Sequence, residues 1–339
     1  MRLPTGTAAI LVIALAGCSG DSEKPRAAEI KAGTCIAKDV ADENDRAPDF
    51  DSVVPCSEPH VYEILDVLDL PKKALNGKTD QEKLANRKDL ATLASTDDEA
   101  SAANDAYFEF AFEACDAALL ETTGYDRLTV DGVDAADALV YPALGQKIAS
   151  PWLNLSPKDH WLDDQRQLIC SARFVKNAND PEGDGPVQPQ SSANDKPLLS
   201  AIGSSSFPVE LRDCNTFDKK DDSRPIGCDK QHYGETLFVF DAESVFDEKF
   251  VKGIDPEKPT DKEMDELDRV CAEVFPTLMS EGYDKSKVRG KAFIGTYWET
   301  DDYKTVGCEL TAVDSKTKDL GPGSFVWTDA KKVELVDAR

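Results

Sequence analysis

The residues of this sequence that could do chemistry in a recognisable pattern are nine cysteines and three histidines. Eight cysteines form two sets of four: Cys35, Cys56, Cys115 and Cys170, then Cys214, Cys228, Cys271 and Cys308. The second cysteine of each set opens the phrase Cys-x3-His-x2-Glu, which holds His60 and Glu63 in one set and His232 and Glu235 in the other. A histidine and a carboxylate this close suggest either acid–base catalysis or metal binding.

The residues that follow this phrase argue against a reactive site. His60 and Glu63 could chelate a metal from one face of a helix. However, apolar and polar residues alternate after His60, which is typical of a strand. On a strand the side chains at positions i and i+3 lie on opposite faces. The third histidine, His160, has no counterpart in the second set. We therefore predict no metal ligand, no cofactor and no catalytic residue. Instead, the imidazole hydrogen-bonds backbone beside a disulfide, and the glutamate fixes a neighbouring turn or helix end.

Other signatures of catalysis are missing from the sequence. There is no Gly-x-Ser-x-Gly elbow, no phosphate-binding glycine loop and no His-Glu-x-x-His. Trp161 and Trp298 precede the fourth cysteine of their sets by nine and ten residues, which favours packing over a disulfide rather than contact with a ligand. Trp152 and Trp327 fall outside this pattern and are the better candidates for an exposed contact.

The N-terminus has the pattern of an export signal. One positive charge at Arg2 is followed by an apolar segment over 8–16 that is too short to span a bilayer. The segment ends in Leu15-Ala16-Gly17-Cys18, which resembles the lipobox of bacterial lipoproteins. The resemblance implies a signal peptide over 1–17, cleavage before Cys18 and lipid on its thiol, followed by a flexible tether over 18–32. The alternative is an ordinary secreted protein.

The remaining eight cysteines indicate disulfides, because exported proteins meet an oxidising compartment. Pairing within each set leaves three possibilities per set. We favour first with second and third with fourth, that is Cys35–Cys56, Cys115–Cys170, Cys214–Cys228 and Cys271–Cys308. No Cys-x-x-Cys occurs, so neither a zinc site nor a thioredoxin-like redox site is indicated.

The formal net charge is −26, which excludes some partners. An acidic surface repels phosphate backbones, so nucleic-acid binding is not expected. Anionic lipid headgroups are repelled as well, so the bilayer should be contacted only through the Cys18 anchor. The acidic charge needs no specific partner to explain it, because a high net charge keeps a protein soluble.

The two sets of cysteines belong to an internal duplication. Gly-Tyr-Asp recurs at 124–126 and 282–284, after apolar residues at helical spacing. These stripes are Phe108, Phe112, Cys115 and Leu119, then Met264, Leu267, Cys271 and Val274. Strands are expected over 60–70, 138–141, 167–175, 236–240, 292–297 and 305–313. The sequence predicts an α+β fold of two tandem disulfide-stapled domains, each a small, mostly antiparallel sheet packed on one main helix.

The boundaries follow from aligning the repeats. The first repeat is expected over 33–210, with polar loops at 72–104 and 177–197, and the second over 211–339. Residues 72–104 have few large apolar side chains and are expected to form either a solvated helical excursion or a mobile loop. The polar stretch 177–197 reads as a linker. It is placed inside the first domain because Gly203–Phe207 beyond it resembles Gly323–Phe325 near the end of the second repeat. Domains that follow each other so closely should share an interface.

The motifs also resemble a known family, the septum-formation domain of actinobacterial lipoproteins and membrane proteins. The resemblance rests on Gly33-Thr34-Cys35, on Val53-Val54-Pro55-Cys56-Ser57-Glu58-Pro59-His60 and on Glu63. The second repeat departs from it, with Gln231 where proline is usual. The resemblance implies an envelope location and a link to cell division, without an enzymatic activity or a ligand.

These patterns together predict a lipoprotein on the outer face of the cell membrane that acts as a non-catalytic binding or scaffold module. The expected partners are envelope or division proteins, or wall polymer. The alternative is an enzyme that acts on the wall, or depends on a metal, and uses His60 or His232.

Overall fold

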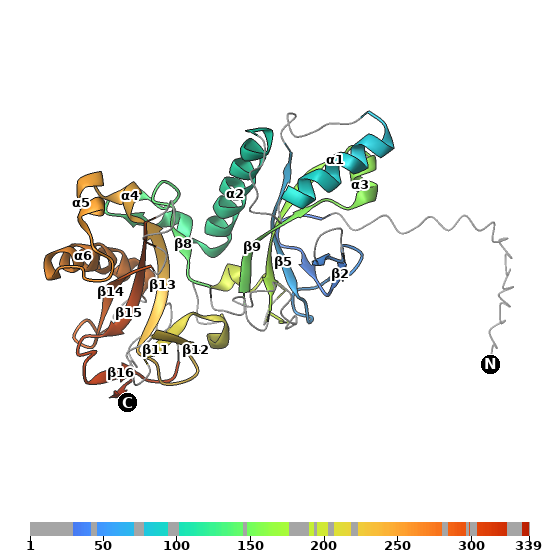
Figure 1. The fold of residues 1–339 in the computed structure, drawn as a ribbon. Coiled ribbons are helices and arrows are strands. Elements are labelled where there is room, and N and C mark those ends of the chain that lie inside the picture. The colour runs from blue at the N-terminus through green and yellow to red at the C-terminus, as the bar shows by residue number, and fades with distance from the viewer. Residues whose placement is uncertain are drawn as a thin grey trace, which may run out of the picture.

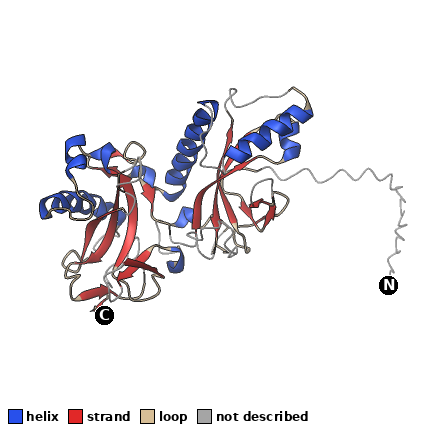
Figure 2. Cartoon of the chain, in the orientation of Figure 1, coloured by secondary structure: helices blue, strands red, loops and turns tan. Residues whose placement is uncertain are grey.

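The computed structural model describes most of the chain after residue 29. The described ranges are 30–41, 46–70, 78–93, 102–144, 148–175, 190–192, 195–202, 207–217, 223–279, 284–295, 298, 304–323 and 334–338. They form a mixed α+β structure with two main antiparallel sheets, four disulfides and one long helix on each sheet, as predicted (Figures 1 and 2). The signal peptide, Cys18 and nearly all of the tether lie outside the described residues.

The first sheet contains five strands in the order β4-β1-β5-β10-β9, and every neighbour is antiparallel. The strands are β1 (Cys35–Ile36), β4 (Val53–Val54), β5 (Tyr62–Asp69), β9 (Ile148–Leu155) and β10 (Gln167–Phe174). Two of them, β5 and β10, were predicted within a few residues. The predictions missed β9, whose sequence is interrupted by a proline.

The long helix α2 (Ala102–Thr123) covers the face of this sheet that is turned toward the second sheet (Figure 1). Cys115 and Leu119 are fully buried, as their helical spacing predicts. Phe112 is 49% exposed, so the predicted stripe is wrong at this position. The helix ends at Gly124, whose φ of 75° is left-handed, a conformation that favours glycine.

The second sheet has the order β12-β11-β13-β15-β14, and β8 pairs with β13 in addition. Its strands are β8 (Tyr141–Pro142), β11 (Cys214–Phe217), β12 (Ser223–Ile226), β13 (Gly234–Asp241), β14 (Val288–Ile294) and β15 (Thr305–Ala312). The helix α6 (Asp261–Leu278) starts at Thr260 with a reciprocal capping box to Glu263. It lies so close to β14 that a side chain at Gly290 would come within 2.9 Å of the Cys271 carbonyl.

Shorter elements complete the two halves. They are β2 (Asp39–Ala41), β3 (Arg46–Pro48), β6 (Thr129–Val130), β7 (Val133–Asp134), β16 (Lys318–Leu320), β17 (Leu335–Asp337), α1 (Asp80–Leu93), α3 (Lys158–Leu162), α4 (Ala242–Val245), α5 (Glu248–Gly253) and the 3-10 turns η2 (Tyr125–Arg127), η3 (Leu199–Ala201) and η4 (Val209–Leu211).

The four disulfides have the pairing that we favoured. They join Cys35 to Cys56, Cys115 to Cys170, Cys214 to Cys228 and Cys271 to Cys308. In each repeat one bridge fastens the long helix to the sheet, and the other closes the first hairpin. The two repeats therefore have the same arrangement of disulfides.

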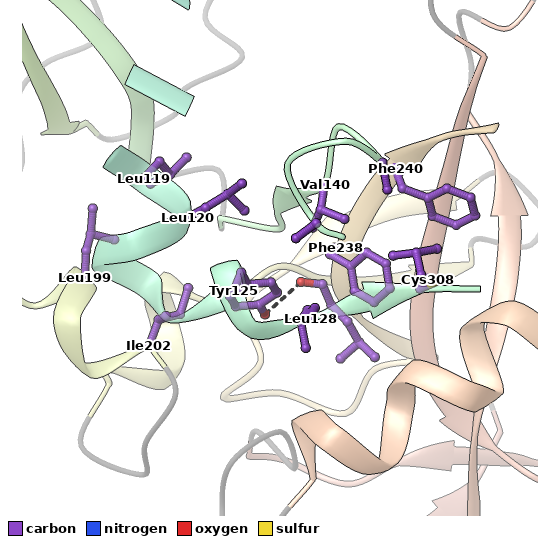
Figure 3. Close-up of a cluster of buried hydrophobic side chains, with 14 of the residues drawn as sticks. Leu119, Leu120, Tyr125, Leu128, Val140, Leu199, Ile202, Phe238, Phe240 and Cys308 are labelled. Carbon is purple, nitrogen blue, oxygen red and sulfur yellow. Dashed lines mark hydrogen bonds between the residues drawn. The ribbon is translucent and has the colours of Figure 1, made fainter. Parts of the chain in front are cut away.

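The two halves share one hydrophobic core. Residues 127–144 of the first repeat pack against the second sheet (Figure 3). The second repeat has a much shorter connection at this point, residues 285–287. Tyr141 pairs with Val239, and the Tyr125 hydroxyl donates to the Leu237 carbonyl at 3.0 Å. The predicted strand 138–141 is therefore wrong in its extent and its sheet. Residues 138–139 lie in a turn, and the short strand that follows joins the other repeat.

Of the two alternatives for the polar segment 72–104, the described part has the helical one. It contains the helix α1, in which Leu90 and Arg87 are buried. The Arg87 Nε donates to the Ser156 carbonyl at 3.0 Å, and the Trp161 indole donates to the Lys83 carbonyl at 2.9 Å. The few apolar residues of this polar helix are supplemented by charged side chains, since Arg87 bonds the residue after β9 and Lys83 Nζ donates to the Leu162 carbonyl at the end of α3.

The matched tryptophans lie in the core. Trp161 is 0% and Trp298 4% exposed, and both belong to the hydrophobic cluster that contains Cys115, Cys170, Cys271 and Cys308. Trp327, the Trp152 side chain and most of the predicted loop 177–197 lie outside the described part of the chain.

Candidate functional site

The histidine of the first repeat is completely buried and bonded at both ring nitrogens. His60 Nδ1 lies 2.9 Å from the Glu58 carbonyl oxygen, and Nε2 lies 3.0 Å from the Glu63 carboxylate. Both side chains are 0% exposed. An imidazole held in this way is screened from any substrate in solution.

The prediction that His60 and Glu63 point to opposite faces is wrong. His60 precedes β5 and forms an isolated bridge to Gln190, with two backbone hydrogen bonds of 2.8 Å. The regular strand begins only at Tyr62, so the alternation of side chains does not extend back to the histidine. The chain bends at Val61, and His60 Nε2 comes within hydrogen-bond distance of the Glu63 carboxylate.

The Glu63 carboxylate fixes the start of a 3-10 turn. It accepts hydrogen bonds from the Leu198 and Leu199 amides, the latter at 3.0 Å, where η3 begins. Backbone amides at the start of a helical turn have no partner within the turn, and a carboxylate satisfies them. The pair therefore connects the first disulfide hairpin to a segment more than a hundred residues later.

In the second repeat the histidine and the glutamate are again buried, but the glutamate has a different partner. His232 Nδ1 lies 2.8 Å from the Lys230 carbonyl oxygen, and the backbone of His232 bridges to Leu320. The Glu235 carboxylate lies 4.0 Å from the Arg212 guanidinium. His232 and Glu235 are 0% and 1% exposed. In both repeats the histidine thus joins the chain after the second cysteine to a segment that follows the fourth.

The same residues form the described clusters whose atom types could ligate a metal. Donor atoms of Cys35, His60 and Glu63 lie within 4.8 Å of one another, as do those of Cys214, His232 and Glu235. In both clusters the sulfur is part of a disulfide, whereas a thiolate is the form that binds metals. The carboxylate of the first cluster is occupied by two amides. Neither donor set fits a zinc ion.

A second group of polar side chains, which the sequence analysis missed, lies on the second sheet. Asp213 and Glu309 are mostly buried, and burial raises the pKa of both carboxyl groups, that of Asp213 to about 6. Asn215 Nδ2 donates to Glu309 at 3.0 Å. Comparing the repeats position by position would have found this group, because Ile36 occupies the place of Asn215 in the first repeat.

Asp213 makes the stability of the chain depend on pH. Burial raises its pKa from 3.8 to about 6, so between these values the folded chain holds a proton that the unfolded chain has lost. Stability therefore falls as the pH rises through this window. Asp213→Asn should raise the free energy of unfolding by up to about 3 kcal/mol at pH 7.5 and by much less at pH 4. Denaturant titration at both values measures this, with the exposed Asp229→Asn as control. An equal effect at both pH values would contradict the assignment.

One shallow groove of about 340 Å³ lies elsewhere on the second repeat, over α5 and the start of α6. Its lining consists of Phe246, Asp247, Phe250, Lys262, Asp265 and Glu266, and it includes neither histidine. No helix in the described part of the chain is long and apolar enough to cross a membrane. Comparisons of the chain with family models, with curated proteins and with solved structures found no match.

Proposed function

We propose that this chain is a non-catalytic binding or scaffold protein of the bacterial envelope. The burial of both histidines is the observation that carries the proposal. His60 and His232 are 0% exposed and bonded to backbone carbonyls beside a disulfide, so neither is placed to meet a substrate. A wall-acting or metal-dependent enzyme would need one of them in an open site.

The proposed location is the outer face of the cell membrane, with a lipid on Cys18 as the anchor. Four disulfides are compatible with a compartment outside the cytoplasm, where they persist. The lipobox-like Leu15-Ala16-Gly17-Cys18 supplies the argument for the anchor. Two or more acyl chains on such an N-terminus would hold the protein stably at the membrane.

The proposed partners are envelope or division proteins. The resemblance of the first repeat to septum-formation domains supports the link to division. The packing of both repeats into one hydrophobic core supports binding by surface contact. The shared core joins both sheets, and Arg269 on α6 adds a bidentate pair with Asp131 at 3.0 and 3.1 Å. Domains that are packed together lose less freedom on binding than domains that move independently.

Crosslinking on intact cells tests this proposal. We expect a membrane-impermeant crosslinker to join the full chain to one or a few envelope proteins, which are then identified after capture. A chain with Cys18→Ala is the matched control, because it should leave the membrane and lose these partners. Recovery of wall polymer without any protein would overturn the protein-partner version of the proposal.

A further inference from the structure

The shallow groove over α5 and the start of α6 combines aromatic and acidic side chains. Figure 1 shows α5 at the edge of the second repeat, away from the sheet of the first repeat. The lining of the groove includes neither a histidine nor a disulfide cysteine, so it is separate from the buried residues that connect the hairpins to later segments. A partner could therefore bind here without disturbing those contacts.

Two phenylalanine rings form the apolar part of the groove. The ring centroids of Phe246 and Phe250 lie 4.9 Å apart, and both side chains are partly exposed. Phe246 also packs against Phe240, with 6.4 Å between the ring centroids, and Phe240 is fully buried in the core. The core therefore holds the two rings in place while part of their surface faces the groove.

The charged side chains of the groove are three carboxylates and one ammonium group, those of Asp247, Asp265, Glu266 and Lys262. Two of the carboxylates have a structural role. Asp247 accepts a hydrogen bond from the Phe250 amide at 2.9 Å, and Glu266 accepts one from the Arg269 guanidinium at 2.8 Å. The surrounding segment 241–268 has eleven acidic and four basic residues, so its field attracts cations.

The third carboxylate, that of Asp265, has no structural role among the described residues. It is exposed, and it forms no hydrogen bond or ion pair with them. Acidic residues stabilise the first turn of a helix, but in α6 this turn already contains Asp261 and Glu263, and Asp265 lies beyond it. The Asp265 carboxylate is therefore available to a ligand in the groove.

An acidic groove with an aromatic surface fits a cation that has a flat apolar face. The arginine guanidinium is such a group, because it stacks on aromatic rings and pairs with carboxylates through two hydrogen bonds. Anionic ligands are repelled by the carboxylates. A shallow groove covers too little of a small free molecule to hold it, whereas a protein segment makes further contacts on both sides of the side chain that enters.

We propose that this groove binds an arginine side chain from a basic segment of a partner protein. The guanidinium stacks on the ring of Phe250 and pairs with the Asp265 carboxylate, and the acidic surroundings attract the rest of the basic segment. The inference rests on the proposed binding function and names the chemistry of the partner surface.

An array of nine-residue peptides tests the groove with the full chain. Each peptide has one central arginine between neutral residues that vary from peptide to peptide. A matched array has citrulline at the centre, which keeps the shape of arginine without its charge. We expect retention on at least one arginine peptide, and about tenfold weaker binding to its citrulline counterpart.

Two variants of the groove should weaken this binding. Asp265→Asn removes the available carboxylate and should lower the affinity about fivefold. Phe250→Leu removes the ring face but keeps an apolar side chain, and should lower the affinity about threefold. Circular dichroism verifies that each variant is folded.

The matched control is Asp229→Asn, which removes the same charge from an exposed position outside the groove and should leave the affinity unchanged. Retention on no arginine peptide, or equal retention on the citrulline array, would overturn the inference. Equal affinities of the Asp265→Asn and Asp229→Asn chains would also overturn it, because the overall charge would then account for the binding. Capture of envelope proteins by crosslinking together with an empty array would remove the arginine site but leave the proposed binding function intact.

Discussion

Glu63→Ala is expected to lower the free energy of unfolding by about 3–5 kcal/mol. The substitution leaves His60 Nε2 and the Leu198 and Leu199 amides buried without their acceptor. Each buried group that loses its partner costs about 1–3 kcal/mol. Denaturant unfolding of the full chain, followed by circular dichroism, measures the change.

Glu58→Ala is the matched control, because its exposed side chain is not part of the pair and only its backbone carbonyl bonds His60. It should change the free energy of unfolding by less than about 0.5 kcal/mol. If Glu63→Ala cost no more than this control, the carboxylate would not hold the fold, and a role in chemistry would have to be reconsidered.

Replacing Cys115 and Cys170 together by alanine should lower stability by about 4 kcal/mol. This bridge joins α2 to β10 over a sequence separation of 55, which is the longest of the four, and both residues are fully buried. A long loop that is closed in the unfolded chain loses the most entropy, so its release costs the most. Denaturant midpoints under oxidising conditions provide the measurement.

The pair Cys214 and Cys228 is the comparison, because its sequence separation is only 14. Its removal should cost about 3 kcal/mol, because the shorter loop confines the unfolded chain less. A larger loss for this short bridge than for Cys115–Cys170 would contradict the ranking and indicate that packing around each disulfide determines its contribution.

The disulfide pairing and the helices and strands that carry it could be predicted because they follow from the spacing of residues close together in the sequence. Cys115 and Cys271 recur on helical stripes, and Cys170 and Cys308 lie in short segments rich in apolar residues that were predicted as strands. Gly124 marks the end of its helix because few other residues adopt a φ of 75°. Each of these features can be recognised from residues that are close together in the sequence.

The contacts between distant segments could not be predicted in this way. The bridge from His60 to Gln190 interrupts the alternation that the sequence suggests, and it becomes visible only once the chain is folded. Tyr141 pairs with the sheet of the other repeat, because the partner of a two-residue strand is decided by tertiary packing. For the segment that contains α1 the sequence left a helix and a mobile loop open, since its apolar content is low and Arg87 supplies part of its attachment.

The buried polar group of Asp213, Asn215 and Glu309 on the second sheet was overlooked for a different reason. Polar residues such as Asn215 and Glu309 are common in an acidic chain, and their burial cannot be inferred from spacing alone. They stand out only against Ile36 and Ser171, the residues that the first repeat has at the same positions.

The central claim is that the buried histidines hold the fold while the surface binds partners. Surface crosslinking of His60→Asn and His232→Asn tests it most directly, with the yield of captured protein expressed per folded molecule. We predict an unchanged yield per folded molecule together with lower stability. A tenfold lower yield from a folded variant would contradict the claim, because a histidine that only holds the fold cannot alter what the folded chain binds.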